Sequence, residues 1–417
     1  MLEMTMGNRI RIAVIGAGAS GMMSAITAAS NGGEVTLYEK NDRVGKKLLA
    51  TGNGKCNLSN LNFSVDQYYC SDRDKLQEIF QTFSVENLIS FFQKCGLMIK
   101  SKNGYLYPYA EQASAVLDVL RMELVEKGVK LLTDKEVSNI TFQRDRQLFQ
   151  IKEPDGKCSF YDKVILACGS PASQKKGAGR TGYKLAEGFG HQIKPIMPGL
   201  VQLISDDVFC KSLAGVRTQV GIRLLADGEE LATECGELQF TDYGISGIPV
   251  FQISRIAGYA LRERKDIEVL VDFFPERDKN DFDELVKTRF TENQKRTLEE
   301  FLTGTLNKKI NMVLIKQCGC KATMTAKEAG FDKVNEMMQK CKAFPIHISG
   351  INSMECAQIC AGGVVFEEVD TNLESKLIPG LYLTGEMVDV DGKCGGYNLQ
   401  WAWTSGYVAG RSAAMDS

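Results

Sequence analysis

The sequence has few of the residues that hold metals or activate nucleophiles. Only two histidines occur, His191 and His347, in 417 residues. A metal site built from several histidines is therefore excluded, and a serine or cysteine triad has few candidate bases. No CxxC pair is present, and the 13 cysteines are an odd number that cannot all pair within the chain. We expect no metal site and reduced thiols, as in a cytoplasmic protein.

The sequence also lacks an excess of charge of one sign and a long hydrophobic run. The formal net charge is -2, from 50 basic and 52 acidic residues, so bulk attraction to nucleic acid or to an anionic membrane is not expected. The apolar stretch 10–29 contains three glycines, and the other apolar runs fall short of the roughly 18 residues that span a bilayer. We expect a small-molecule substrate as the partner, with no nucleic acid and no stable membrane association. No feature of the sequence predicts an oligomeric state.

The composition is that of a globular protein with more than one domain. Hydrophobic residues make up 44% and charged residues 24% of the chain, and about 150 residues per domain predicts two or three domains. Glycine-rich strand and helix patterns occur near both ends, while short alternating strands and a charged helical stretch lie between them. We therefore predict one nucleotide-binding α/β domain, residues 1–195 and 356–417, interrupted by an inserted domain at 196–355.

A glycine-rich turn between two strand patterns is the strongest motif. Arg11–Ile15 predicts a strand, Gly16-x-Gly18-x-x-Gly21 opens a helix, and the next strand ends at Glu39. In this context the glycines permit a tight turn, approach of a pyrophosphate and close helix packing, and the helix N-terminus attracts phosphate. The carboxylate of Glu39 suits ribose hydroxyls and disfavours a ribose phosphate. The motif alone leaves NAD and FAD open.

Other glycine-rich segments also suit a dinucleotide. Residues 45–57 combine lysines, glycines and small polar groups, which suit an anion or a flat ring. Residues 380–406 predict a strand, a glycine loop and a helix whose N-terminus can face a second anion or a polarised carbonyl. A second GxGxxG match at 177–182 lacks a preceding strand and a following acid, so no nicotinamide-binding unit is predicted there. Lys175, Lys176 and Arg180 beside it form a basic loop that suits an anionic substrate, NAD(P)H or solvent.

Together with residues 167–171, 241–247 and 361–364, these segments resemble the bacterial flavoprotein family of the aminoacetone oxidase and 3-dehydro-bile-acid Δ4,6-reductase type. The resemblance spans nearly the whole chain. It implies non-covalent FAD and an α/β fold: a glutathione-reductase-like FAD-binding Rossmann domain interrupted by an inserted α+β domain with a β-barrel and helices. Carried onto this sequence, the FAD-binding residues are Gly16, Gly18, Ala19, Ser20, Gly21, Glu39, Lys40, Lys46, Lys47, Thr51, Gly52, Asn57, Val137, Gly169, Gly385, Glu386, Asp391, Gly396, Asn398 and Leu399.

The resemblance favours an FAD-dependent oxidoreductase. We expect an NAD(P)H-linked reductase of a conjugated C=C in an enone such as a steroid or bile-acid ketone, with NAD(P)H bound transiently. Tyr243, Cys394 or water would protonate the α-carbon, and backbone amides up to Tyr397 would polarise the carbonyl. The alternative is a flavin-dependent oxidase of a small amine such as aminoacetone. A non-catalytic flavoprotein or RNA-associated module is a third hypothesis, and the lack of a basic stripe counts against RNA.

Overall fold

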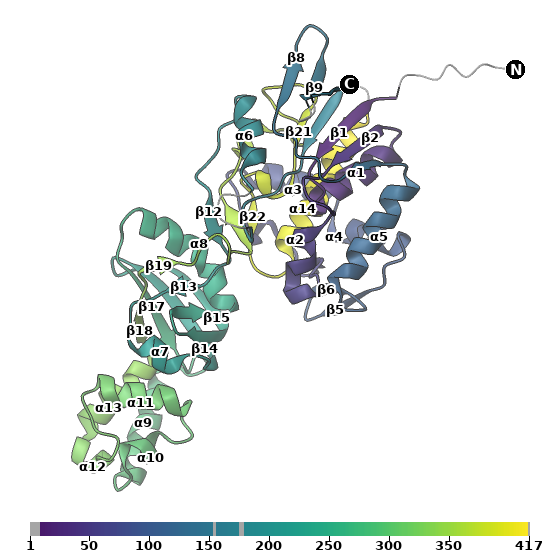
Figure 1. The fold of residues 1–417 in the computed structure, drawn as a ribbon. Coiled ribbons are helices and arrows are strands. Elements are labelled where there is room, and N and C mark those ends of the chain that lie inside the picture. The colour runs from purple at the N-terminus through teal and green to yellow at the C-terminus, as the bar shows by residue number, and fades with distance from the viewer. Residues whose placement is uncertain (1–8, 153–155, 175–178, 416–417) are drawn as a thin grey trace, which may run out of the picture. The chain divides into compact units, whose positions relative to one another are not determined.

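The structure is a computed structural model that describes residues 9–152, 156–174 and 179–415 (Figure 1). The chain divides into two compact units, residues 1–197 with 358–417, and residues 198–357. Lys175 and Lys176 of the basic loop, and the first two residues of the second GxGxxG match, Gly177 and Ala178, lie outside the described residues. Among the described helices, none has both the length and the apolar character needed to cross a membrane.

A five-stranded parallel sheet organises the first unit (Figure 1). Its strand order is β21-β11-β1-β2-β7, and every neighbouring pair is parallel. Because the strands point the same way, the turns after them share one edge, where ligands bind in open α/β sheets. The bounds are β1 (Arg11–Ile15), β2 (Glu34–Tyr38), β7 (Lys130–Leu132), β11 (Lys163–Leu166) and β21 (Leu381–Leu383).

Helix α1 (Ala19–Ser30), near the start of the chain, packs against helix α14 (Tyr397–Ala413), near its end. A Cβ added at Gly406 would lie 2.4 Å from Ser20 O, and one added at Gly410 would lie 2.4 Å from Ser24 O. Only glycine at these positions lets the two backbones approach so closely. The C-terminal segment therefore packs directly on the helix that follows the first glycine turn.

Residues 73–95, whose apolar residues recur with a helical period throughout, form two helices. α3 (Arg73–Thr82) ends at Phe83, and α4 (Val85–Lys94) begins after Ser84. Ser84 and Asn87 form a capping box, in which each side chain bonds the other residue's backbone. The new cap satisfies free amides at the start of α4 and so favours a break within a continuous apolar pattern.

Smaller elements complete the first unit. The helices are α2 (Lys46–Ala50), α5 (Ala113–Glu126) and α6 (Thr181–Gly188). The strands are β3 (Ser59–Asn60), β4 (Tyr68–Tyr69), β5 (Ile99–Lys102), β6 (Tyr105–Pro108), β8 (Ile140–Gln143), β9 (Leu148–Lys152), β10 (Cys158–Tyr161), β20 (Ile359–Ala361) and β22 (Asp391–Gly392); β12 (Met197–Gly199) lies where the chain passes to the second unit.

The second unit contains a seven-stranded antiparallel sheet that closes on itself. The strand order is β18-β17-β14-β15-β16-β13-β19, and only two residues separate β18 (Phe344–His347) from β19 (Gly350–Ile351). Between them Ile348 N donates to Ile267 O and Ser349 N donates to Ile204 O. Consecutive amides point to opposite sides of a strand, so this one segment closes the sheet into the predicted barrel. The other strands are β13 (Leu203–Ile204), β14 (Arg217–Ala226), β15 (Glu229–Thr241), β16 (Gly244–Ser246) and β17 (Ile267–Asp272).

The second unit also contains helices, and its charged stretch is helical, as the sequence predicts. Their apolar sides join the barrel strands in one buried core, for example through Phe282, Phe301 and Phe344. The bounds are α7 (Phe209–Leu213), α8 (Ile248–Arg262), α9 (Lys279–Asn293), α10 (Leu298–Leu302), α11 (Lys308–Gln317), α12 (Ala326–Ala329) and α13 (Phe331–Lys342).

Candidate functional site

The first glycine turn leaves no room for side chains at two of its three glycines. Gly16 has φ +104°, and a Cβ added there would lie 2.5 Å from Ala167 O. A Cβ added at Gly21 would lie 1.8 Å from Gly16 O. These two glycines therefore serve the turn itself and the packing of α1 against it, as the motif predicts.

Gly18 has the opposite surroundings. It is the N-cap of α1, no side chain caps this helix end, and an added Cβ would meet nothing within 4 Å. The backbone amides of Ala19 and Ser20 follow in the first helical turn, which carries partial positive charge. An open position at an uncapped helix start fits a pyrophosphate group.

Glu39 lies beside this turn at the end of β2. The residue is 7% exposed. Its Oε2 accepts a hydrogen bond of 2.9 Å from Ala17 N, and its Oε1 accepts one of 2.9 Å from Asn41 N. Lys135 N donates to Glu39 O, which brings the buried Val137 toward the same strand end. A buried carboxylate beside the glycine turn fits the ribose of an adenine dinucleotide.

The second glycine-rich segment contacts the third through an ion pair. Lys47 Nζ lies 2.6 Å from Glu386 Oε2, and Glu386 Oε1 accepts a hydrogen bond of 3.0 Å from Cys360 N. Both oxygens of Glu386 are therefore held in place. Lys46 instead pairs with the exposed Asp42 at 2.7 Å. The structure thus brings Lys47, but not the Lys46 ammonium, to the third segment.

Two other candidate side chains form hydrogen bonds within the protein, and two candidate glycines contribute through their backbone. Lys40 Nζ donates to Gln174 Oε1 at 3.4 Å, and Thr51 Oγ1 donates to Leu48 O at 2.6 Å. Gly52 has φ +56° within the loop, while Gly169 has φ +66° and open space where a Cβ would lie. Gly169 follows β11 at the ligand edge of the sheet, so its backbone is the accessible group there.

The start of α14 is held by amide side chains. Gly396 is its N-cap, with φ +95°. Asn57 accepts from Gly396 N at 3.3 Å in the amide orientation that satisfies its other partners. Asn398 Oδ1 accepts from Gly392 N at 2.8 Å, and its Nδ2 donates to Gly392 O at 2.6 Å. These bonds set the shape of the glycine loop before α14.

The remaining candidates of the third segment are close to the first turn or to the core. A Cβ added at Gly385 would lie 2.6 Å from Ser20 Oγ, so the end of β21 touches the first turn of α1. Asp391 is 3% exposed and pairs with Tyr69 in the short sheet of β22 and β4. Leu399 packs against the core of the first unit.

The three candidate catalytic residues have different surroundings. Burial raises the pKa of the Cys394 thiol, which favours its neutral form. Burial also raises the pKa of Tyr397, whose hydroxyl donates to Asn62 O at 3.1 Å. Tyr243 belongs to the second unit, between β15 and β16, and is 39% exposed. Cys394, in the loop before α14, and Tyr397, the first residue of α14, are therefore close in the chain, and the role of Tyr243 stays a prediction.

Two residues near Glu386 were missed by the sequence analysis. Tyr183 is buried, and its hydroxyl donates to Glu386 O at 3.4 Å. Burial raises the pKa of Cys360 to about 12. No local pattern marks either residue, because both reach Glu386 from distant parts of the chain.

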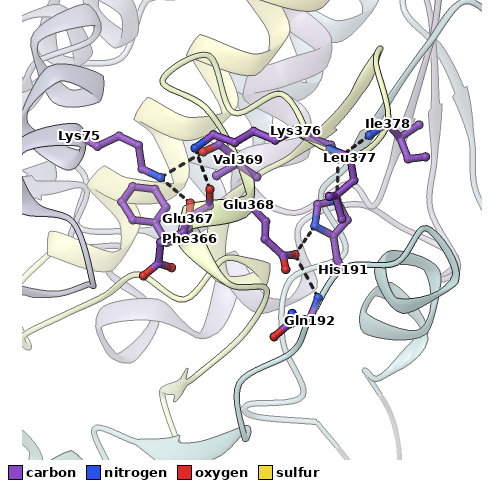
Figure 2. A network of polar contacts seen from close by, with 11 residues as sticks. Lys75, His191, Gln192, Phe366, Glu367, Glu368, Val369, Lys376, Leu377 and Ile378 are labelled. Carbon is purple, nitrogen blue, oxygen red and sulfur yellow. Dashed lines mark hydrogen bonds and ion pairs between the residues drawn. The ribbon is translucent and has the colours of Figure 1, made fainter.

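A buried histidine anchors the segment before β21 (Figure 2). His191 Nδ1 lies 2.8 Å from Glu368 Oε2, and its Nε2 lies 2.8 Å from Ser375 Oγ. His191 N also donates to Ala186 O at 3.1 Å, just after the end of α6. The histidine has a structural role here, because its ring is enclosed and both nitrogens are used.

Lys75 holds the same segment from α3 (Figure 2). Its ammonium donates to Phe366 O and to Val369 O at 3.1 Å, and it lies 3.7 Å from the centre of the Phe366 ring. Burial lowers the pKa of Lys75. These contacts lead the chain into β21 and so to Glu386.

A parallel sheet with an open glycine turn, an uncapped helix start and a buried terminal acid defines a dinucleotide-binding Rossmann domain. The chain belongs to the HI0933-like protein family, whose Rossmann-domain model matches residues 10–412. The predicted family and the α/β fold class are both confirmed. The chain is accordingly a flavin-dependent oxidoreductase with FAD as its cofactor.

Relatives cover the chain almost completely. The 3-dehydro-bile acid delta(4,6)-reductase of Clostridium scindens is 42% identical over 97% of this chain and 99% of its own length. The ribosomal RNA dihydrouridine synthase of Haemophilus influenzae is 28% identical over 96% of this chain and 97% of its own. The solved structure of 3-ketosteroid-delta4-(5alpha)-dehydrogenase from Rhodococcus jostii RHA1 has a TM-score of 0.51 at 16% identity and covers 99% of both chains. This last likeness concerns the fold alone.

Proposed function

We propose that this protein reduces a C=C bond conjugated to a ketone in a steroid or bile-acid enone, with NAD(P)H as the transient electron donor. The observation that carries the proposal is the 42% identity, over 97% of the chain, to the 3-dehydro-bile acid delta(4,6)-reductase. In the net reaction the β-carbon gains a hydride equivalent, the α-carbon gains a proton, and NAD(P)H becomes NAD(P)⁺. Bound FAD supplies the two-electron redox chemistry that links donor and substrate.

We propose that the FAD is held by the groups already in place around the glycine turn. The open position at Gly18 and the start of α1 would take the pyrophosphate, and Glu39 would take the adenosine ribose. Glu386, oriented by Lys47 and Cys360 N, would bind hydroxyl groups of the flavin side chain. The remaining contacts proposed are Ala19, Ser20, Lys40, Lys46, Thr51, Gly52, Asn57, Val137, Gly169, Gly385, Asp391, Gly396, Asn398 and Leu399.

In the proposed reaction the protein itself donates a proton and polarises the carbonyl group of the substrate. A proton donor must keep its proton at neutral pH, and the raised pKa of Cys394 meets this condition. Burial also raises the pKa of Tyr397, whose hydroxyl donates to Asn62 O, so Cys394 and Tyr397 are both candidate donors. Amides at the start of α14 would polarise the substrate ketone. Tyr243 is a candidate from the inserted unit, which would supply the apolar surface for substrate.

The test follows the visible absorbance of the FAD-loaded protein without oxygen. NADH or NADPH should bleach the flavin, and a steroid enone should restore its colour with formation of the saturated ketone. Bleaching by small amines instead would replace the proposal with the amine oxidase. Return of colour with uridine-containing ribosomal RNA, but with no enone, would point to the activity named for the Haemophilus relative.

A further inference from the structure

The hairpin of β5 and β6 carries lysines and tyrosines on one face. In its register Lys100 is opposite Tyr107, and Lys102 is opposite Tyr105. Opposite residues of an antiparallel pair share a face. The intervening Leu106 is buried in the core, so these four residues face away from it. We call them the tyrosine–lysine face.

This face lies beside the glycine loop that precedes α14. A Cβ added at Gly395 would lie 2.7 Å from the Tyr105 ring, and Asn60 Nδ2 donates to Gly395 O at 3.1 Å. Burial raises the pKa of Tyr107, with smaller contributions from nearby Tyr105 and Cys394. The two tyrosine rings are therefore neighbours of Cys394, a candidate proton donor.

The outer part of the face is positively charged. Lys102 is exposed. Lys100 Nζ lies 2.7 Å from Glu111 Oε1, and Lys55 Nζ lies 2.8 Å from Glu111 Oε2. The Glu111 carboxylate thus pairs with two ammonium groups, and together with Lys102 these four residues carry two more positive than negative charges.

We propose that the tyrosine–lysine face binds the end of the substrate remote from the reacting bond, and that this end is a carboxylate on a flat apolar ring system. The inference rests on the proposed function and adds the charge of the substrate to it. Aromatic rings offer large, rigid contact area to apolar rings. Ammonium groups at the rim complement a carboxylate.

Glu111 and Lys102 should affect the binding of an acid in opposite directions, a result that a change in packing alone would not produce. Its negative charge repels a substrate carboxylate and engages Lys55 and Lys100. Removal of the Glu111 charge should therefore strengthen binding of an acid, whereas removal of the Lys102 charge should weaken it. A neutral analogue with the same rings should respond to neither change.

The experiment compares a steroid enone that ends in a carboxylate with the same steroid as its primary amide. Equilibrium dialysis against the FAD-loaded protein gives the Kd of each compound for wild type, Lys102→Met, Glu111→Gln and the control Lys152→Met. Lys152 is an exposed strand lysine of β9. We expect Lys102→Met to raise the Kd of the acid about threefold to fivefold, as for loss of one exposed ion pair. Glu111→Gln should lower it, and the amide and the control should not change.

The inference is overturned if Lys102→Met and Lys152→Met affect the acid equally, or if the amide follows the acid in every variant. Enone reduction is assayed in parallel on the same preparations. Reduction of both compounds with equal binding of acid and amide would reject the carboxylate site and leave the proposed function standing. No binding and no reduction of either compound would reject both.

Discussion

Glu39 Oε2 accepts a hydrogen bond of 2.9 Å from Ala17 N, and this bond ties the end of β2 to the glycine turn after β1. The other oxygen accepts from Asn41 N at 2.9 Å. The residue is 7% exposed, so both bonds lie largely away from bulk water. The acid that the motif assigns to a ribose therefore also holds the turn that would bind the pyrophosphate.

Glu39→Ala should cost stability as well as FAD affinity. The substitution leaves two backbone amides without their acceptor, which costs about 1–3 kcal/mol per buried unpaired group. Urea unfolding with and without saturating FAD measures both effects. Glu34→Ala is the matched control, because Glu34 is an exposed acid of the same strand. Equal stability of the two variants would contradict the structural role of Glu39.

Gly18→Ala and Gly21→Ala should separate cofactor binding from folding. A methyl group at Gly18 meets nothing within 4 Å in the protein and would meet only a bound phosphate. We expect unchanged stability without FAD and a Kd for FAD at least about tenfold higher, since a loss of roughly 1.4 kcal/mol is tenfold. At Gly21 a methyl group would lie 1.8 Å from Gly16 O, so the apoprotein itself should be destabilised by about 2 kcal/mol or more.

The measurements for this pair are urea unfolding and titration of FAD by fluorescence. Gly188→Ala is the control, because an added Cβ there also meets nothing within 4 Å, and the site lies at the end of α6. FAD binding by Gly18→Ala at the affinity of wild type would show that no pyrophosphate approaches this glycine.

The βαβ unit was predictable because all its signals are local. The strand, the glycine spacing and Glu39 lie within about 30 residues, and each glycine has the surroundings that its place in the motif requires. The break between α3 and α4 also had a local signal in Ser84, but the apolar periodicity on both sides concealed it.

Contacts between distant segments were not predictable in this way. Lys47 and Glu386 are 339 residues apart. Neither residue type nor spacing indicates that Lys47, rather than Lys46, pairs with Glu386. The alternation of Tyr105 and Tyr107 was visible, yet only the strand register places them opposite lysines and beside Gly395. The fold brings such groups together through packing, which a single sequence does not encode in its spacing.

The two histidines should differ sharply in their importance for stability. His191 is 3% exposed and bonds Glu368 and Ser375, so His191→Leu removes one hydrogen bond from each partner and leaves an apolar side chain against their polar atoms. We expect a loss of about 2–4 kcal/mol in the free energy of unfolding. His347 pairs with Asp266 at 3.0 Å on the surface, where such pairs contribute about 1 kcal/mol or less.

Urea unfolding of His191→Leu and His347→Leu at one pH gives the comparison. A Ser375→Ala variant should show part of the His191 effect, because it removes one of the two ring contacts and an acceptor for Leu377 N and Ile378 N. Similar losses for both histidine variants would contradict the enclosed network of Figure 2.

The thirteen free thiols should fall into distinct reactivity classes. Burial raises the pKa of Cys56, Cys341 and Cys360 from 9.0 to about 12. Because the thiolate is the nucleophile, these three should resist iodoacetamide in the folded protein even when the pH is raised from about 8 to about 9.5. The exposed thiols, which are Cys158, Cys235 and Cys356, should react first.

The same shifts predict a dependence of stability on alkaline pH. Each buried thiol binds its proton more tightly in the folded than in the unfolded chain. Its contribution to the free energy of unfolding is therefore complete below pH 9.0 and is lost as the pH rises toward about 12.

Peptide mass spectrometry after timed alkylation, with a urea-unfolded sample as the reference for complete labelling, measures the reactivity classes of the thiols. Rapid labelling of Cys360 in the folded protein would show that the backbone around Glu386 opens, and would weaken its assignment as a rigid contact for FAD.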